Sequence, residues 1–363
     1  MARLGDYVRI RTGKLDANAS SENGRYPFFT CAVEPLRIDS YSYDCECVLV
    51  AGNGDLNVKY YNGKFDAYQR TYIIESIDKS VLSVPYLYFF LDKYVETLRY
   101  EAIGGVIKYI KLGNLTEAQI PLLSLEEQAK VVCEIDKAND LISLRKQQLQ
   151  KLDELVKARF VELFGDVIRN DRGWEQYTFS DIATSRLGKM LDAKQQTGKY
   201  AYPYLANFNV QWFRFEIDNL NKMDFNEGDR REFELHDGDL LVCEGGEIGR
   251  CAVWHNEIQP CYFQKALHRV RCNQHIVLPD YMAWWFKYNC DHKGFAAIEG
   301  AKATIAHLPG AKLKALKVTA PPIEFQNQFV AFLKQTDKSK LAIQQSLDKL
   351  ELLKKALMQK YFG

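Results

Sequence analysis

The chain has 363 residues, of which 47% are hydrophobic and 26% charged, and its 48 lysines and arginines nearly balance 47 aspartates and glutamates, for a net charge of +1. This length predicts two or three domains, and the ordinary composition excludes a wholly disordered chain. The near-neutral charge argues against tight DNA binding by this chain alone, because isolated DNA-binding domains usually carry a basic excess.

The N-terminal segment and the cysteines predict a cytoplasmic protein. Residues 1–13 contain four charged side chains and no apolar stretch, unlike a secretory signal. No apolar run approaches the roughly 18 residues of a membrane span. The nine cysteines are an odd number, and the closest pair, Cys45 and Cys47, is one residue too tight for a CxxC zinc motif. We therefore expect reduced thiols and no metal site.

Residues 1–119 come first and alternate short apolar or aromatic runs with Gly, Asn and Asp, a pattern typical of strands and turns. A short aromatic helix is predicted at 86–94. Residues 122–164 then contain no Gly or Pro, and apolar residues recur at every seventh position from Ile135 to Leu163. This pattern predicts one amphipathic helix, about 50–60 Å long at 1.5 Å per residue.

The rest of the chain repeats this order. Residues 166–319 again read as strands and turns, with an aromatic helix at 281–288, and residues 323–362 are a second long stretch free of Gly and Pro. At the helix ends, 147–165 and 345–363 are identical at nine of nineteen positions. Further matches in the same order are Leu4–Asp6 with Phe179–Asp181, Val48–Asp55 with Leu240–Glu247, Gln69–Arg70 with Gln264–Lys265, Pro85–Leu87 with Pro279–Tyr281, Ala102–Gly105 with Ala297–Gly300, and Pro121–Gln128 with Pro321–Gln328.

This duplication predicts an α+β protein with two similar mixed α/β globular domains and two long helices. The predicted segments are a globular domain at 1–119, a helix at 120–165, a globular domain at 166–319 and a helix at 320–363. A long amphipathic helix must bury its apolar stripe against a partner. We predict that the two helices pair with each other as an antiparallel coiled coil, with pseudo-two-fold symmetry. The alternative is that each helix packs only on its own globular domain.

These motifs, in this order, resemble the specificity subunits of type I restriction-modification systems. The resemblance covers nearly the whole chain and is carried by LGDYVRIRTGK (4–14), the YPF and YPY elements at Tyr26 and Tyr202, CYFQKALHRVR (261–271), IPLLSLEEQ (120–128) and APPIEFQNQ (320–328). It implies that each globular domain is a target recognition domain that reads one half of a bipartite site in double-stranded DNA. It also implies that the long helices are spacers between the two domains.

The resemblance further implies partners, and no catalysis by this chain itself. The spacer helices would dock methyltransferase (modification) subunits, expected to number two, and a restriction/translocase subunit is left open as a further partner. S-adenosylmethionine, ATP and magnesium are expected only on those partner subunits, so no cofactor or catalytic residue is predicted here.

Candidate DNA-binding residues are polar side chains in loops at matched positions of the two repeats, because Arg, Lys, Asn, Gln, Glu and Asp match the donors and acceptors of base edges. In the first repeat they are Lys14, Asn53, Asp55, Asn57, Lys59, Gln69, Arg70 and Lys108. In the second they are Lys189, Glu244, Glu247, Arg250, Gln264, Lys265, His268 and Lys302. The alternative for each is a solvated loop side chain, and for His268 a strand-edge histidine.

Three other functions compete with this one. An autonomous two-headed DNA-binding regulator is disfavoured by the near-neutral charge, and a scaffold with protein-binding heads would show no sequence preference. A nuclease is suggested by Pro279-Asp280 and Asp291-His292-Lys293, which fit a loose PD…DxK pattern whose carboxylates would share a magnesium ion. The intervening residues read as a helix, which disfavours the nuclease.

Overall fold

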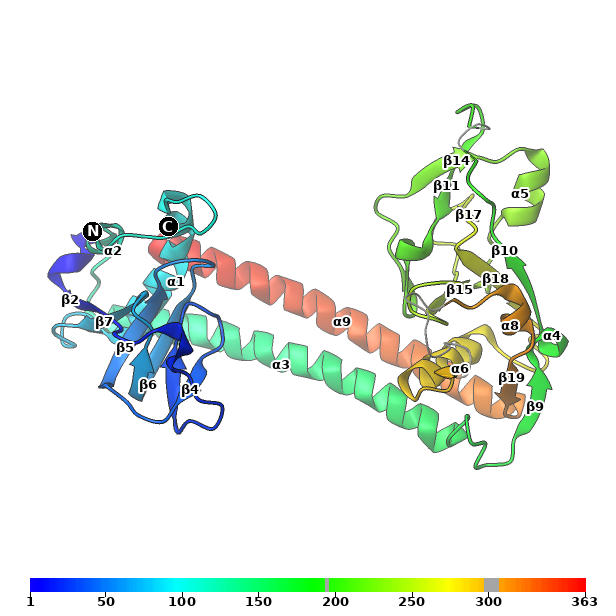
Figure 1. Ribbon diagram of the computed structural model, residues 1–363, viewed down its shortest axis with the longest axis horizontal. Helices are drawn as coiled ribbons and strands as arrows, with labels where there is room; N and C mark the ends of the chain where they lie inside the picture. Colours follow the sequence, from blue (N-terminus) through cyan, green and yellow to red (C-terminus); the bar gives the residue numbers. More distant parts are fainter. Residues whose placement is uncertain (193–195, 297–306) are drawn as a thin grey trace. The chain divides into compact units, whose positions relative to one another are not determined.

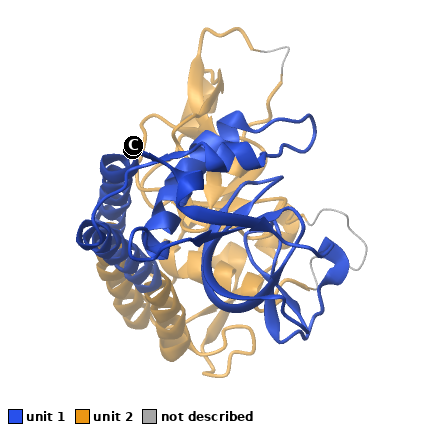
Figure 2. Cartoon of the chain, turned by 90° about the vertical axis from the view of Figure 1, so that its left-hand side faces the viewer, with its two compact units in different colours: residues 1–149, 342–363 blue, residues 150–341 orange. Residues whose placement is uncertain are grey.

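The structure is a computed structural model that describes residues 1–192, 196–296 and 307–363 (Figure 1). The chain divides into two compact units, residues 1–149 with 342–363 (unit 1) and residues 150–341 (unit 2), as Figure 2 shows. Each unit combines a globular head with parts of both long helices. The boundaries of these compact units cut through both long helices.

The head of unit 1 is built on a six-stranded sheet with the order β2-β7-β5-β6-β3-β4, in which only the β3–β6 pair is parallel. A two-stranded sheet pairs the strands β1 and β8. The elements are β1 (Ala2–Arg3), β2 (Val8–Thr12), β3 (Tyr26–Phe29), β4 (Leu36–Ile38), β5 (Tyr43–Ala51), β6 (Val58–Ala67), β7 (Thr71–Ser76), α1 (Val84–Glu101), α2 (Leu112–Thr116) and β8 (Gln119–Ile120). Helix α1, longer than the predicted 86–94, shares one core with β5 and β7.

The head of unit 2 contains a four-stranded sheet, β10-β18-β15-β16, a three-stranded sheet, β14-β11-β17, and two strand pairs, β12–β13 and β9–β19. The elements are β9 (Glu175–Thr178), α4 (Phe179–Ile182), β10 (Ala183–Leu187), β11 (Ala201–Leu205), β12 (Val210–Gln211), β13 (Arg214–Phe215), β14 (Asn221–Asp224), α5 (Glu227–Phe233), β15 (Leu240–Cys243), β16 (Cys251–Val253), β17 (Tyr262–Phe263), β18 (Leu267–Cys272), α6 (Pro279–Asp291), α8 (Gly310–Lys314) and β19 (Lys317–Ala320). The three-stranded sheet shares a buried core of aromatic and aliphatic side chains with one face of the four-stranded sheet.

The two long helices are α3 (Leu125–Phe164) and α9 (Ile323–Phe362), each of 40 residues. Ser124 and Glu127 cap the start of α3, because each side chain accepts a hydrogen bond from the other residue's backbone N–H. Gly165, with φ +70°, ends it in the left-handed conformation that favours glycine. The predicted limits of both helices are therefore correct to within a few residues.

Within each unit the two helices run antiparallel. In unit 1 the hydroxyl of Tyr361 donates to Glu134 at 2.7 Å, and Arg145 Nε donates to Ser346 Oγ at 3.2 Å. The helices run in the same antiparallel way in unit 2. Lys340 of α9 pairs with Asp153 of α3 at 2.6 Å, and Phe329, earlier in α9, packs on Phe160, later in α3. The predicted antiparallel pairing is confirmed. Each long helix also contributes side chains to the core of unit 1 and to the core of unit 2.

A fully buried glutamine joins the head of unit 1 to the start of α3. The side-chain oxygen of Gln128 accepts a hydrogen bond from the backbone N–H of Ser83 at 2.9 Å. Its Nε2 donates to the carbonyls of Val81 and Leu123 at 2.7 and 2.9 Å. Because buried backbone groups need partners, this one amide satisfies three of them at the junction of head and helix.

Gln326 repeats the same three bonds in unit 2, and it too is fully buried. It accepts from the N–H of Leu278 at 2.8 Å and donates to the carbonyls of Ile276 and Pro321 at 2.8 and 2.7 Å. The sequence comparison that matched Gln128 with the exposed Gln328 is therefore wrong by two residues. In the corrected match, Gln128 and Gln326 each lie three residues after the first residue of their own helix.

Replacing Gln326 with alanine should lower the free energy of unfolding of unit 2 by about 3 kcal/mol, because three buried backbone groups lose their partner. All five tryptophans of the chain lie in unit 2, so their fluorescence during urea unfolding follows that unit alone. The matched control is Gln328→Ala on the same helix, which should change stability by less than about 0.5 kcal/mol. Equal effects of the two variants would contradict the corrected match.

Among the described residues, no helix combines the length and the hydropathy that a membrane crossing requires.

Candidate nucleic-acid interface

In unit 1, backbone hydrogen bonds bring the predicted loops together at one end of the sheet. The N–H of Gln69 donates to the carbonyl of Leu15 at 2.9 Å, which joins the loop of Lys14 to the β6–β7 turn. Gly52 donates to the carbonyl of Arg70 at 2.8 Å, and Gly54 to that of Lys108 at 2.9 Å. Loops separated by up to 94 residues of sequence therefore form one surface.

Close backbone approach explains two glycines in this surface. A Cβ atom on Gly13 would collide with the carbonyl oxygens of Ala67 and Tyr68, and one on Gly52 would collide with the carbonyl oxygen of Arg70. A side chain at either position would force the neighbouring backbone to shift. Gly188 repeats the role of Gly13 in unit 2.

Unit 2 assembles the equivalent loops by equivalent bonds. Lys265 N–H donates to the carbonyl of Lys189 at 2.9 Å, and Glu244 N–H donates to that of Ala266 at 3.0 Å. Because Lys265 makes the bond that Gln69 makes in unit 1, the sequence match of Gln69 with Gln264 is displaced by one residue. The match of β5 with β15 is confirmed, since both pair with the same register in their sheets.

The candidate side chains of unit 1 fall into two groups. Lys14, Asp55, Gln69, Arg70 and Lys108 are exposed on the loop surface, although Asp55 lies 3.4 Å from the guanidinium of Arg99.

The other three candidates of unit 1 are half-buried and bonded within the protein. Asn57 Nδ2 donates to the carbonyl of Cys31 at 2.8 Å, which braces the neighbouring loop. Lys59 donates to Asn57 Oδ1, and burial lowers the pKa of its ammonium group. Asn53 forms a backbone bridge with Tyr109. The side chains of Asn57 and Lys59 therefore hold neighbouring segments of the surface together.

Unit 2 shows the same division. Lys265 and Glu247 are exposed, while Glu244 and Gln264 are half-buried. Arg250 makes a contact like that of Asn57 in unit 1, because its Nη2 donates a hydrogen bond to the carbonyl of Asn207 at 3.0 Å. Lys302 lies outside the described residues.

Two further candidates of unit 2 have internal partners. Lys189 Nζ donates to Asp229 Oδ2 at 2.5 Å and to the carbonyl of Asp224 at 2.6 Å. His268 is 2% exposed, its Nε2 lies 3.0 Å from the carbonyl oxygen of Leu308, and burial lowers its pKa. A side chain so deeply buried cannot contact DNA in this conformation, so His268 is a core residue and not a DNA contact.

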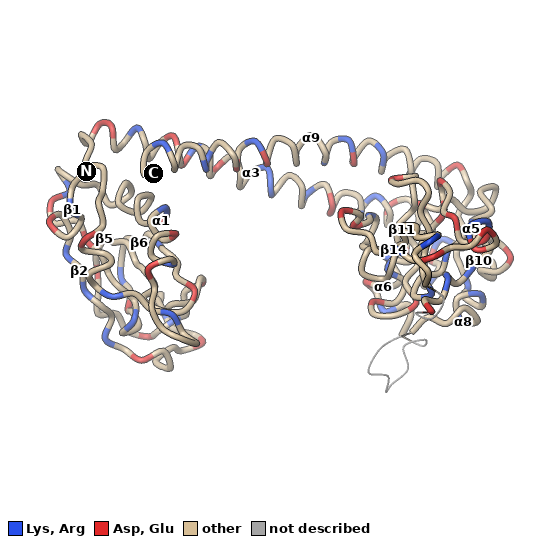
Figure 3. Tube along the Cα trace, turned by 90° about the horizontal axis from the view of Figure 1, so that it is seen from above, with Lys and Arg blue, Asp and Glu red and all other residues tan. Residues whose placement is uncertain are grey.

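Charges of both signs are mixed over the molecule. Figure 3 shows lysine and arginine interspersed with aspartate and glutamate over both heads and along both helices, as the net charge of +1 requires. The basic candidates exposed on the loops of unit 1 are Lys14, Arg70 and Lys108.

The nuclease alternative fails on geometry. Asp280 and Asp291 lie near the two ends of α6, and eleven residues of helix separate them by about 16 Å. One magnesium ion cannot bind both carboxylates at that distance. Asp291 instead pairs with Lys287 at 2.6 Å, and burial raises the pKa of Asp280. Among the described residues, no group of three or more His, Cys, Asp and Glu side chains could hold a metal ion.

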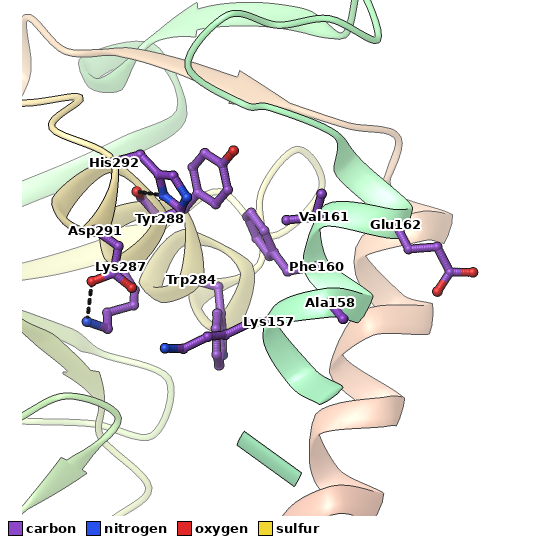
Figure 4. Close-up of a pocket in the computed structure, with 10 residues that line it drawn as sticks. All are labelled: Lys157, Ala158, Phe160, Val161, Glu162, Trp284, Lys287, Tyr288, Asp291 and His292. Carbon is purple, nitrogen blue, oxygen red and sulfur yellow. Dashed lines mark hydrogen bonds and ion pairs between the residues drawn. The ribbon is translucent and has the colours of Figure 1, made fainter. Parts of the chain in front are cut away.

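A groove of about 580 Å³ lies between α3 and α6 in unit 2. Figure 4 shows Phe160 and Trp284 facing it, the Tyr288 and His292 rings side by side, and Glu162 pointing away. Apolar and aromatic side chains form most of the groove wall, and of the charged residues that line it, Lys287 and Asp291 pair with each other at 2.6 Å.

One part of the loop surface of unit 1 was not among the predicted residues. Val106 and Ile107 form an exposed apolar tip beside Lys108, with Val106 fully exposed and Ile107 62% exposed. The sequence contained a signal for this tip. Two β-branched residues directly follow Gly104-Gly105 and precede the candidate Lys108 in the same loop.

Known proteins similar to this chain share one description. A family model, Type I restriction modification DNA specificity domain, matches residues 1–154 and 171–353. The type I restriction enzyme EcoDI specificity subunit of Escherichia coli is 38% identical over 213 residues, which are 59% of this chain but only 47% of that protein. A putative type I restriction enzyme specificity subunit of Haemophilus influenzae, S.HindORF215P, is 23% identical over 374 residues, 93% of this chain and 88% of its own length.

Two solved structures have the same fold. The crystal structure of a type I restriction-modification system S subunit from M. genitalium matches 100% of this chain and 95% of its own, with a TM-score of 0.62 at 15% identity. A structure described for complex assembly and conformational transition of the type I R-M system matches 99% and 96%, with a TM-score of 0.61 at 16% identity.

Proposed function

Because this chain belongs to the family of type I restriction modification DNA specificity domains, we propose that it is the specificity subunit of such a system. In this role the two heads read the two halves of a bipartite site in double-stranded DNA. The long helices space the heads and dock methyltransferase (modification) subunits, expected to number two. The chain itself catalyses nothing and works in the cytoplasm.

The observation that carries this proposal is the repeated assembly of the loop surface. In both heads the same backbone bonds gather the same loops, although the side chains on them differ. Matched scaffolds with different exposed residues suit two readers of different half-sites, as in dimeric DNA-binding proteins with two reading elements. The exposed set, with Lys14, Gln69, Arg70, Lys108 and Lys265, supplies donors for phosphates and base edges.

The near-neutral charge fits a reader that shares the DNA with partners. Phosphate neutralisation supplies much of the affinity for DNA, so modification subunits that grip the duplex would supply what this chain lacks. Those subunits would also bind S-adenosylmethionine, and ATP and magnesium belong to a restriction/translocase subunit if one joins. An autonomous regulator would instead need tight binding by the isolated chain, which its charge does not favour.

Footprinting of the reconstituted complex tests this proposal. The full chain is co-expressed with the modification subunit encoded beside it, purified, and used for base-contact footprinting of genomic fragments that it retains. The expected pattern is two short contacted sequences separated by an unspecified gap of fixed length, seen only with the complex. A footprint from the chain alone would favour the autonomous regulator, and retention of all fragments equally would favour the protein-binding scaffold.

Removing one exposed arginine should weaken binding to all sequences alike. For Arg70→Ala we expect a slope of log affinity against log salt that is smaller by about one, since one phosphate contact is lost. Arg9→Ala is the matched control, because Arg9 is exposed on β2 opposite Glu75, at the far ends of these strands from the loops. If both variants change the slope equally, the loop surface does not bind phosphates.

A further inference from the structure

We infer that the Val106-Ile107 tip in unit 1 is an apolar wedge that enters a DNA groove and unstacks a base step; this rests on the proposed function. Residues 104–108 form a closed loop, because Ile103 and Tyr109 exchange two backbone hydrogen bonds, of 3.0 and 2.8 Å. Gly104 has φ +123°, and a Cβ there would collide with the carbonyl oxygen of Ile107, so the tight turn depends on glycine.

The loop is held against the rest of the proposed interface. Gly54 donates to the carbonyl of Lys108 at 2.9 Å, and Ile110 donates to the carbonyl of Gly52 at 3.0 Å. A bridge between Asn53 and Tyr109 lies between these bonds. The C-terminal side of the tip is therefore fastened to the turn that carries the candidate reading residues, and its N-terminal side is held through the Ile103–Tyr109 pair. A fastened loop loses less conformational entropy on binding than a free one.

The chemistry of the tip suits a DNA groove. Single exposed apolar residues are common on protein surfaces, but here two adjacent β-branched residues project from a closed loop next to the exposed Lys108. Proteins that deform DNA combine cationic contacts with apolar side chains inserted between base steps. Val106 and Ile107 would supply the insertion, and Lys108 would hold the adjacent phosphate.

The test uses the full complex with its modification subunits and a duplex that carries its methylated motif. The fluorescent base 2-aminopurine, which brightens when unstacked, is placed at one position at a time through both half-sites. The methylated adenines are left out, because extrusion of the target base by the methyltransferase would brighten the probe as well. We expect a bright step in at least one half-site.

Val106→Ser with Ile107→Ser should abolish that bright step and weaken specific binding about tenfold, through lost apolar burial. The apolar replacements Val106→Ile and Ile107→Val should keep both signals. Ile77→Ser is the matched control: Ile77 is 62% exposed, like Ile107, but follows the opposite end of β7 from the loops, and its replacement should change neither signal.

Each other outcome overturns the wedge. Unchanged brightness and affinity in the Ser variants would show that the tip does not touch DNA. Weaker binding without any bright step in the wild type would reduce it to a surface contact, such as one with a thymine methyl group. Loss of co-purifying modification subunits would make it a protein contact. A wild-type complex that binds no specific sequence would instead overturn the proposed function.

Discussion

Four residues inserted into each long helix should lengthen the gap between the two half-sites by about one to two base pairs and leave both half-sequences unchanged. The insertions belong after Leu149 in α3 and after Leu341 in α9, where each helix passes from one compact unit to the other. Four residues add about 6 Å of helix and little more than one full turn, so each helix keeps nearly the same face toward its partner. DNA rises about 3.4 Å per base pair.

The readout is the methylated motif of cells that express the variant with the modification subunit. A four-residue insertion between Asp218 and Asn219, an exposed connection inside unit 2, is the control and should leave the gap unchanged. If the helix insertions alter a half-sequence while the gap stays the same, the helices do not act as the spacer.

Replacing Phe160 with alanine should lower the free energy of unfolding of unit 2 by about 3–5 kcal/mol. Phe160 is 1% exposed on α3, and its ring lies 5.9 Å from that of Tyr281 in α6 and 5.4 Å from that of Phe329 in α9. The truncation would leave a cavity where two long helices meet the head. Tryptophan fluorescence during urea unfolding measures the loss.

The neighbouring Val161 provides the control for Phe160. It lies on the same turn of α3 and is 45% exposed, so Val161→Ala should cost less than about 0.5 kcal/mol. A similar small loss for Phe160→Ala would mean that the head is held to α3 by other contacts, and the aromatic cluster would not be the main link between them.

The sequence predicted the helices well because their signals are local. Absence of Gly and Pro and a heptad pattern define residues 122–164 and 323–362, and the capping residues Ser124 and Glu127 lie within one turn. The match of Gln128 with Gln328 was wrong because Gln326 and Gln328 are both glutamines. Only Gln326 is buried, and that difference cannot be read from the residue type. Burial depends on tertiary contacts with residues some 50 positions earlier, which no local pattern reveals.

The loop surface was predicted in position but not in detail. Glycines at matched positions of the two repeats located the loops, because tight turns and close backbone contacts favour glycine. They could not tell which side chains point outward, because the partners are remote: Lys189 pairs with Asp229, and Arg250 braces Asn207. Residues 206–239, which contain β12, β13, β14 and α5 of unit 2, have only the shorter segment 30–47 as counterpart and gave no matched signal.

Base-resolution methylome sequencing of host DNA, after co-expression of this chain with its neighbouring modification subunit, tests the central claim most directly. We predict one new bipartite methylated motif, with two different half-sequences and an unspecified gap of fixed length. Expression of the modification subunit without this chain should leave that motif unmethylated. A stable complex that methylates a single continuous sequence, or the same motif in the absence of this chain, would contradict the account.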